Sequence, residues 1–195
     1  MMNISEIAEY VWDNSQVVCF GNTPQWDTYL FKDVWRKNQS FSKSWKEAGA
    51  GWYWFISDMT YDELHSCSKP ATLPDKGCNI GLLSHENREI FGDALLCTPI
   101  DSKVVIYNGH ESNVTARLRS HFALNNNQTG AIGLEHYPLS NKNWQARYFS
   151  TPCFTASILI EEKKQIELLM KSYSGRCAVE SSWRVSHGWP ILCKE

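Results

Sequence analysis

Three polar residues spaced by four, Asn113, Arg117 and His121, lie on one stripe of a predicted helix that follows an apolar run. Two tyrosines, Tyr53 and Tyr107, lie on predicted strands. Hydrolysis of a phosphodiester needs a cation to offset the charge of the phosphate, a base for the attacking water and usually a metal held by a carboxylate. Together with a glutamate from later in the chain, these side chains could supply all three.

The tyrosines and the polar stripe belong to two predicted strands and the helix after the second strand. Residues 51–57, "GWYWFIS", crowd aromatic side chains behind a glycine and predict a buried strand. Residues 103–109, "KVVIYNG", are rich in β-branched side chains and predict a second strand. Ser112 or Asn113 can cap the next helix. We expect this helix to face the core through residues spaced by four, namely Val114, Leu118 and Phe122.

Short helices and an irregular segment surround these strands. Helical spacing of apolar residues at 4–12 and at 26–35 predicts an arm of short helices within residues 1–50. Residues 58–102 are punctuated by proline and glycine, and only 84–96 has a helical pattern. We interpret residues 58–102 as an insertion.

The C-terminal part predicts a loop, a strand and two helices. Residues 125–148 have the composition of a long loop with some extended structure, and the alternation in 154–162, "FTASILIEE", predicts a third strand. A break at Gly175 separates a last helix around 178–185 from the helix before it. We expect that earlier helix to pack through Ile166, Leu169, Met170 and Tyr173.

A set of motif residues is spread over the two strands and the helix: Gly51-Trp52-Tyr53, Tyr107-Asn108-Gly109, Asn113, Arg117, Leu118 and His121. This set resembles the signature of the GIY-YIG nuclease superfamily, and the chain is most similar to its type II restriction endonucleases. The resemblance covers roughly residues 51–57 and 103–190. Trp52 and Asn108 stand where the family has aliphatic residues. Both alternate to the opposite strand face from the tyrosines, so we expect neither to touch the reacting groups.

The resemblance implies an α+β fold with a small, three-stranded, mainly antiparallel sheet flanked by helices. It divides the chain into an N-terminal helical arm, residues 1–50, and a nuclease core, residues 51–195. Residues 58–102 then form a long insertion between the first two core strands. We expect this insertion to take part in DNA recognition.

The resemblance also implies a catalytic set, namely Tyr53, Tyr107, Arg117, His121 and Glu180. One of the two tyrosines, as a phenolate, would help to deprotonate water, and Arg117 would offset charge on the phosphate. His121 would position the tyrosine or shuttle a proton. Glu180 would hold a single Mg²⁺, or Mn²⁺, against the leaving oxygen, and Glu167 on the preceding helix is the rival for that role.

The activity implied is sequence-specific hydrolysis of double-stranded DNA by a type II restriction enzyme. Candidate DNA contacts are Lys103, Asn113 and Arg119. Cutting both strands of a palindrome favours a homodimer or two sequential visits, and a cognate DNA methyltransferase would be the genetic partner. Two alternatives stay open: a repair or recombination nuclease that acts on branched or damaged DNA, and an inactive DNA-binding module with the same fold.

Composition and charge are compatible with these expectations. The 195 residues are 43% hydrophobic, which suffices for one core with an appended arm. The apolar runs are too short for a membrane span and the N-terminus lacks a secretory pattern, so we expect a cytoplasmic protein without membrane contact. Residues 1–102 hold 8 Lys and Arg against 14 Asp and Glu, whereas residues 103–195 hold 11 against 7. The C-terminal part is therefore the one that could face phosphate.

The seven cysteines are odd in number and scattered, which indicates reduced thiols rather than a disulfide framework. Three residues of the insertion, His65, Cys67 and Cys78, could bind Zn²⁺ if His85 or Cys97 supplied a fourth ligand. Their spacing does not match common structural zinc sites, and idle thiols are the default interpretation.

Overall fold

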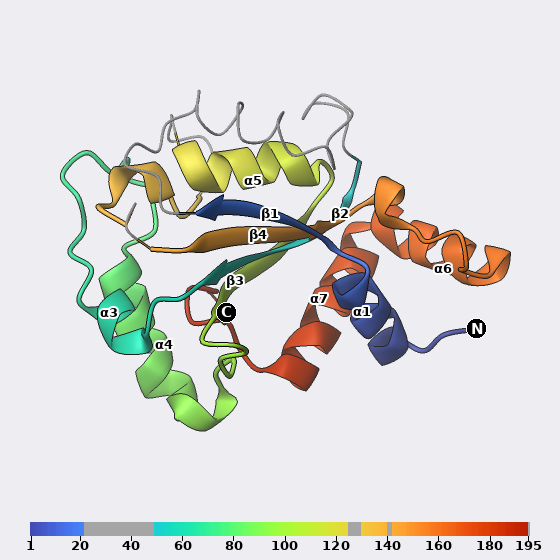
Figure 1. Ribbon diagram of the computed structural model, residues 1–195, viewed down its shortest axis with the longest axis horizontal. Coiled ribbons are helices and arrows are strands. Elements are labelled where there is room, and N and C mark those ends of the chain that lie inside the picture. Colours follow the sequence, from blue (N-terminus) through green and yellow to red (C-terminus); the bar gives the residue numbers. More distant parts are fainter. Residues whose placement is uncertain (22–48, 125–129, 140–141, 195) are drawn as a thin grey trace.

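A computed structural model describes residues 1–21, 49–124, 130–139 and 142–194. The described residues form one four-stranded antiparallel sheet in the order β1-β4-β2-β3, with helices on both faces (Figure 1). The strands are β1 (Gln16–Gly21), β2 (Gly51–Ser57), β3 (Val104–Glu111) and β4 (Trp144–Phe149). The α-helices are α1 (Ile4–Asp13), α3 (Tyr61–His65), α4 (Ile80–Leu95), α5 (Val114–Ala123), α6 (Ile160–Lys171) and α7 (Tyr173–His187). Short 3₁₀ turns occur at Leu134–His136 and Thr151–Cys153.

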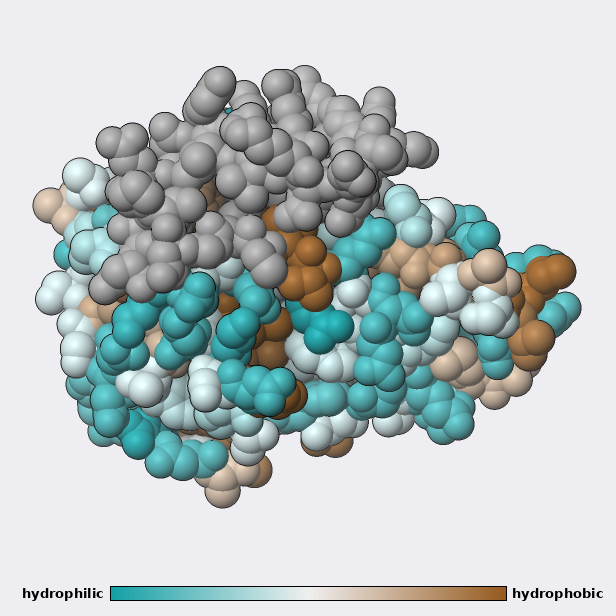
Figure 2. Space-filling view, viewed as in Figure 1, coloured by the Kyte–Doolittle hydropathy of each residue, from teal (hydrophilic) through white to brown (hydrophobic). Residues whose placement is uncertain are grey.

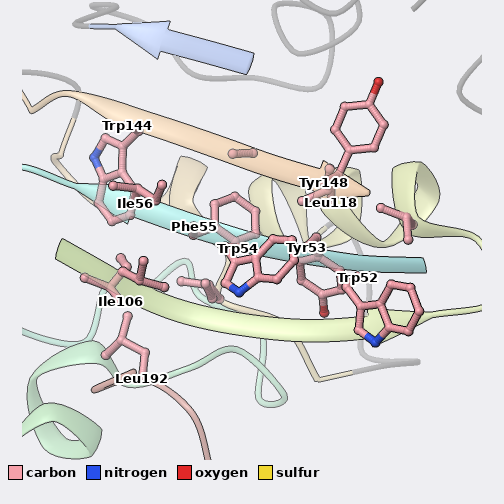
Figure 3. Close-up of a cluster of buried hydrophobic side chains, with 14 of the residues drawn as sticks. Trp52, Tyr53, Trp54, Phe55, Ile56, Ile106, Leu118, Trp144, Tyr148 and Leu192 are labelled. Atoms are coloured by element: carbon pink, nitrogen blue, oxygen red, sulfur yellow. The ribbon is translucent and has the colours of Figure 1, made fainter. Parts of the chain in front are cut away.

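Strand β2 is the centre of the sheet, and all seven of its residues are buried. Its side chains alternate between two layers. Phe55 lies 5.6 Å from the ring of His121 on α5, whereas Trp54 lies 5.8 Å from the ring of Trp183 on α7. Helix α5 therefore covers one face of the sheet, while α7 and α1 cover the other (Figure 1). Figure 3 shows the apolar cluster that these layers enclose.

Strand β3 is an edge of the sheet, and its register with β2 places the motif residues. Tyr53 pairs with Gly109 and Phe55 pairs with Tyr107, and the register shifts between Phe55 and Ile56. Because side chains alternate along a strand, Tyr107 and Gly109 face the α5 layer while Asn108 faces the α7 layer. The open edge of β3 is thus reached from both faces of the sheet.

The structure confirms the predicted α+β class and the elements that carry the motif. Strands β2 and β3 coincide with the predicted strands at 51–57 and 103–109 within two residues, and α1 occupies the helical pattern at 4–12. Asn113 caps α5 by accepting a hydrogen bond from the Ala116 backbone N–H at 3.0 Å. Val114, Leu118 and Phe122 are buried, as expected. The predicted helical segment 26–35 lies outside the described residues.

The third predicted strand, at 154–162, was placed wrongly. Strand β4, at Trp144–Phe149, pairs with β2, whereas 154–159 forms turns and Ile160 begins α6. Leu159 and Ile160 are more than 60% exposed, so the alternation there has no partner layer to bury it. Apolar side chains gather at the end of the molecule formed by α6 (Figure 2). In β4, Trp144, Ala146 and Tyr148 carry the alternation that the core buries.

The sheet also has a fourth strand that the sequence analysis did not assign. Strand β1 follows α1 and pairs with the outer edge of β4, with Val18 opposite Ala146. Residues 1–21 are therefore not only helical, because they contribute both a helix beside α7 and an edge strand. The apolar alternation within residues 16–21 is too short to predict this strand from the sequence alone.

The helix break near the C-terminus occurs earlier than predicted. Ser172 has extended backbone angles and caps α7 by accepting a hydrogen bond from the Gly175 N–H at 2.9 Å. Gly175 lies buried inside α7, close to the Leu169 backbone, and it does not break the helix. Tyr173 begins α7 and is 72% exposed, so it does not pack against the core.

The insertion packs against the C-terminal segment. The Asn87 amide on α4 donates hydrogen bonds to the carbonyls of Ile191 and Cys193, and Cys97 pairs with Trp189 through the backbone. Leu192 in turn donates a backbone hydrogen bond to Ile106 on β3. Part of the β3 edge is therefore covered by residues that the insertion holds. None of the described helices is long and apolar enough to cross a membrane.

Gly51 tests the packing of β2 against β4. A Cβ atom added there would lie 1.9 Å from the carbonyl oxygen of Phe149, so Gly51→Ala must push the two strands apart. We expect Gly51→Ala to lower the free energy of unfolding by about 2 kcal/mol or more, the scale of overpacking. Urea denaturation measures this loss. Gly49→Ala is the matched control, because its Cβ would meet only an ordinary contact at 3.7 Å, and equal stabilities of the two variants would contradict the pairing.

Candidate active site

A pocket of about 650 Å³ runs along the open edge of β3. It is bounded by β3 itself, by α5 on one face of the sheet, by α7 on the other, and by segments 76–78 and 130–132. The two segments are joined through backbone hydrogen bonds, including Cys78 N–H to the Ala131 carbonyl at 2.9 Å. All five predicted catalytic residues line this pocket: Tyr53, Tyr107, Arg117, His121 and Glu180.

His121 and Tyr53 are joined deep in the pocket. The Nε2 atom of His121 lies 2.9 Å from the hydroxyl of Tyr53, and its Nδ1 accepts a hydrogen bond from the Ile132 backbone N–H at 3.2 Å. Burial, aided by the charge of Arg117, lowers the pKa of His121 well below its usual value. The ring is therefore neutral. Because Nδ1 is an acceptor, Nε2 carries the proton and donates a hydrogen bond to the Tyr53 hydroxyl. His121 orients the tyrosine and is not free to act as a base.

Gly109 leaves the space that Tyr53 needs. A Cβ atom at Gly109 would lie 2.5 Å from the Tyr53 hydroxyl, which crosses over this residue from the neighbouring strand. A larger side chain would displace the hydroxyl from His121. This close approach is the physical reason for a glycine after Tyr107-Asn108.

Tyr107 is the more readily ionised of the two tyrosines. Its ring stacks on that of Tyr53 at 6.2 Å, and it is half-buried whereas Tyr53 is 1% exposed. Burial raises the pKa of Tyr107 to about 12, and the charge of Arg117 and hydrogen bonding from Tyr53 act in the opposite direction. Burial raises the pKa of Tyr53 well above its usual value, since that ring is fully enclosed.

Arg117 is the cation beside the two tyrosines. Burial lowers the pKa of Arg117, but the charges and hydrogen bonds of Tyr53 and Tyr107 outweigh this effect and raise it. The guanidinium therefore stays charged in a half-buried position on α5. A fixed cation there can stabilise a phenolate and can accept the charge of a phosphate.

Glu180 reaches the pocket from the other face of the sheet. Its Oε1 atom pairs with Arg184, one turn later on α7, and its Oε2 atom lies 3.6 Å from Nε2 of His110. Burial raises the pKa of Glu180 and Arg184 opposes that rise. Burial and the charge of Arg176 lower the pKa of His110 to about 4, so His110 is neutral near pH 7. Glu167 lies on α6 and is not among the residues that line the pocket, so of the two glutamates only Glu180 could hold a metal there.

Several residues that line the pocket were missed by the sequence analysis. Cys177 and Arg184 lie three residues before and four residues after the predicted Glu180, a spacing that places them on one stripe of α7. His110 continues the face of Asn108 along β3. Asn108 corrects an expectation, because it lines the pocket and its side-chain oxygen accepts a hydrogen bond from Arg184 at 2.9 Å.

The three predicted DNA contacts lie outside the pocket. Lys103 precedes β3 and pairs with Ile100 through the backbone. Asn113 serves as the cap of α5. Arg119 is half-buried on α5. The pocket instead presents Lys76 and Lys194, both exposed, at its rim.

The zinc site considered for the insertion is not formed. The Cys97 thiol donates a hydrogen bond to the Gly188 carbonyl, and the Cys67 thiol donates one to the Glu63 carbonyl. Although His65 and His85 are in ring contact, no three His, Cys, Asp or Glu side chains within the described ranges gather as a metal site.

Glu180 is compatible with a divalent cation that needs few protein ligands. Mg²⁺ keeps several waters and is usually held by one or two carboxylates together with substrate phosphates. Glu180 lines the pocket; its Oε2 atom lies 3.6 Å from His110 Nε2, beyond hydrogen-bond distance, whereas Oε1 is engaged by Arg184. One carboxylate oxygen beside a phosphate site fits Mg²⁺ or Mn²⁺ and does not fit an all-protein cage.

Comparisons of this chain with protein-family models, with characterised proteins and with solved structures found no match.

The buried neutral His121 makes stability depend on pH. Its folded pKa is below the value of about 6.5 expected in the unfolded chain, so the unfolded state takes up the extra proton and the wild type loses stability as the pH falls below about 6.5. We expect the stability difference between wild type and His121→Gln to shrink by up to about 1.4 kcal/mol per pH unit in this range. Urea denaturation from pH 7.5 to 5 measures both proteins, and parallel stability curves would contradict a neutral His121.

Proposed function

We propose that this protein is a divalent-cation-dependent endonuclease that hydrolyses phosphodiester bonds of double-stranded DNA. The observation that carries this proposal is the convergence of Tyr53, Tyr107, Arg117, His121 and Glu180 on one pocket, from β2, β3, α5 and α7. These residues are far apart in sequence and come from both faces of the sheet. Packing alone gives no reason for a buried tyrosine pair, a cation and a carboxylate to share one pocket.

Each residue has a separate task in this proposal. Tyr107, as a phenolate, accepts a proton from the attacking water, and Arg117 stabilises both the phenolate and the charge that builds up on the phosphate. His121 donates to Tyr53 and so fixes the hydroxyl that Tyr53 directs at Tyr107. Glu180 would hold Mg²⁺ or Mn²⁺, which supplies Lewis-acid stabilisation of the leaving oxygen.

The charge of the pocket supports an anionic substrate. Its lining contains two lysines and two arginines against two glutamates, Glu111 and Glu180. His110 and His121 are neutral near pH 7, so they do not change this balance. A net positive pocket attracts the phosphate backbone of a nucleic acid.

We assign the protein to restriction of double-stranded DNA in the cytoplasm, with a cognate DNA methyltransferase protecting the host sequence. Segment 76–78 of the insertion and Leu83 of α4 line the pocket, which supports a part for the insertion in recognition. Cleavage of both strands requires either a homodimer or two successive binding events at the same DNA site. The presence of the complete set of polar groups argues against an inactive binding module.

Plasmid cleavage tests this proposal. We expect the protein with Mg²⁺ to cut a mixed-sequence plasmid into discrete fragments, and EDTA to abolish cutting. Glu180→Gln and Arg117→Ala should each lower the rate by at least about 100-fold, because each removes a charge that stabilises the transition state. Glu167→Gln and Arg88→Ala are matched controls outside the pocket and should retain the wild-type rate.

Three outcomes would change the assignment. Cleavage of flaps or junctions alone would favour a repair nuclease over a restriction enzyme. Duplex binding without cleavage would favour the binding module. Loss of activity in Glu167→Gln but not in Glu180→Gln would move the metal to α6.

The role of Tyr107 predicts a rising pH profile. Because its pKa is about 12, the phenolate fraction grows about tenfold per pH unit between pH 6.5 and 9, and the single-turnover cleavage rate should follow it. Tyr107→Phe should lower the rate by about 100-fold or more and flatten the profile. Tyr10→Phe, which removes a hydroxyl that bonds to Thr155 away from the pocket, is the control. A wild-type rate independent of pH in this range would rule out Tyr107 as the proton acceptor.

A further inference from the structure

Three contacts hold the Arg184 side chain of α7 beside Glu180. Its Nη2 atom pairs with Oε1 of Glu180, and its Nε atom donates to Oδ1 of Asn108 at 2.9 Å. Its guanidinium lies 4.3 Å above the ring centre of Trp189. A planar guanidinium with two bonded edges and a stacked face has little rotational freedom. The residue therefore joins the carboxylate on α7 to the edge strand β3.

Asn108 is itself fixed in one orientation. It is 2% exposed, its backbone N–H donates to the Cys193 sulfur at 3.3 Å, and the Cys193 thiol lies 3.3 Å from Oδ1. An amide oxygen is needed at this place, because the Nε–H of Arg184 requires an acceptor in a nearly buried environment. This requirement gives a physical reason for an asparagine at position 108, where the family that the sequence resembles has an aliphatic residue.

Trp189 links the same arginine to the insertion. Its ring stacks on Phe91 of α4 at 4.7 Å, and its Nε1 donates to the Cys193 carbonyl at 3.2 Å. Its backbone N–H donates to the Leu95 carbonyl at 2.8 Å. The stacking platform of Arg184 is thus set by the insertion and by the C-terminal segment together.

The placement of Glu180 depends on these contacts. A glutamate side chain has three rotatable bonds, and of the two carboxylates that line the pocket Glu180 is the one that pairs with Arg184. Arg184 engages Oε1, so Oε2, 3.6 Å from the neutral His110, is the oxygen that could bind a cation. Partners that orient a ligating carboxylate typically change metal affinity or activity by 10- to 100-fold when they are lost.

We propose that Arg184, held by Asn108 and Trp189, is a positioning residue that fixes the Glu180 carboxylate, whose Oε2 would hold the divalent cation beside the substrate phosphate. This inference rests on the proposed function and deepens it. It makes the insertion, through Trp189, a structural support of the metal carboxylate as well as a flank of the pocket. Arg184 acts through Glu180 and not directly on the reacting atoms.

Two variants separate positioning from charge. Arg184→Lys keeps the positive charge, but one ammonium cannot reproduce the fork that bonds Glu180 and Asn108 together. Asn108→Leu keeps a branched γ-carbon and removes the acceptor of the Arg184 Nε–H. Arg88→Lys on α4 is the matched control, because Arg88 pairs with Asp62 and Asp93 outside the pocket. Urea denaturation of each variant identifies any that fails to fold.

The measurement is the Mn²⁺ dependence of two quantities. One is the single-turnover cleavage rate, and the other is Mn²⁺ binding in the presence of an uncleavable phosphorothioate duplex, followed by the electron paramagnetic resonance signal of the free ion. We expect Arg184→Lys and Asn108→Leu to raise the half-saturating Mn²⁺ concentration by about 10- to 100-fold in both, with KM for the duplex unchanged within about twofold. Arg88→Lys should match the wild type.

The outcomes distinguish this inference from the proposed function. A wild type that cuts DNA, with both folded variants showing wild-type Mn²⁺ dependence, overturns the positioning role and leaves the nuclease intact. An increase in KM alone overturns it too, because Arg184 would then contact the substrate. A wild type that neither cuts DNA nor binds Mn²⁺ with the duplex overturns the proposed function, and the positioning role with it.

Discussion

The pairing of β2 with the edge strand β3 is the constraint on which the pocket depends. It sets Tyr53 opposite Gly109, so that the Tyr53 ring crosses a residue without a side chain and its hydroxyl reaches His121. The same register turns Tyr107 toward α5 and Asn108 toward α7. Because β3 is an edge, side chains from the two helical layers meet around it. A central strand would have kept the Arg117 and Glu180 layers apart.

Burial sets the charge state of this pocket. It keeps His121 and His110 neutral and raises the pKa of both tyrosines, and the half-buried charges that remain in the pocket include Arg117, Arg184 and Glu180. A neutral histidine can donate a hydrogen bond without adding repulsion to a cation, which suits a site crowded with arginines. In the mechanism that we propose, proton transfer would fall to Tyr107, whose ionisation the charge of Arg117 favours.

Local patterns predicted the part of the site that lies on contiguous elements. Tyr107, Arg117 and His121 follow one another on a strand and the next helix, so strand alternation and helical spacing were enough to relate them. Tyr53 required a motif match, since residues 58–102 separate it from Tyr107. Glu180 also rested on the motif, and its place in the pocket agrees with that choice over Glu167.

The missed elements depend on contacts that only the folded chain supplies. The alternation at 144–149 is at least as regular as that at 154–162, and only the segment at 144–149 has β2 beside it to bury its apolar face. Strand β1 forms because β4 offers an edge with which it can pair. The sequence predicted the third strand at 154–162 instead, so it gave no sign of that edge. The roles of Arg184 and Trp189 depend on contacts with Asn108 and α4, which are distant in sequence. Helical spacing from Glu180 was the one signal that pointed to Arg184.

Mass spectrometry of cleaved DNA in H₂¹⁸O is the most direct test of hydrolysis at this pocket. The protein is incubated with duplex DNA and Mg²⁺ in labelled water, beside Arg117→Ala as the matched inactive control. We expect each strand break made by the wild type to leave one terminal phosphate that carries a single ¹⁸O, because water attacks the phosphorus directly. Strands that stay full length, or that break equally in Arg117→Ala, would contradict the account.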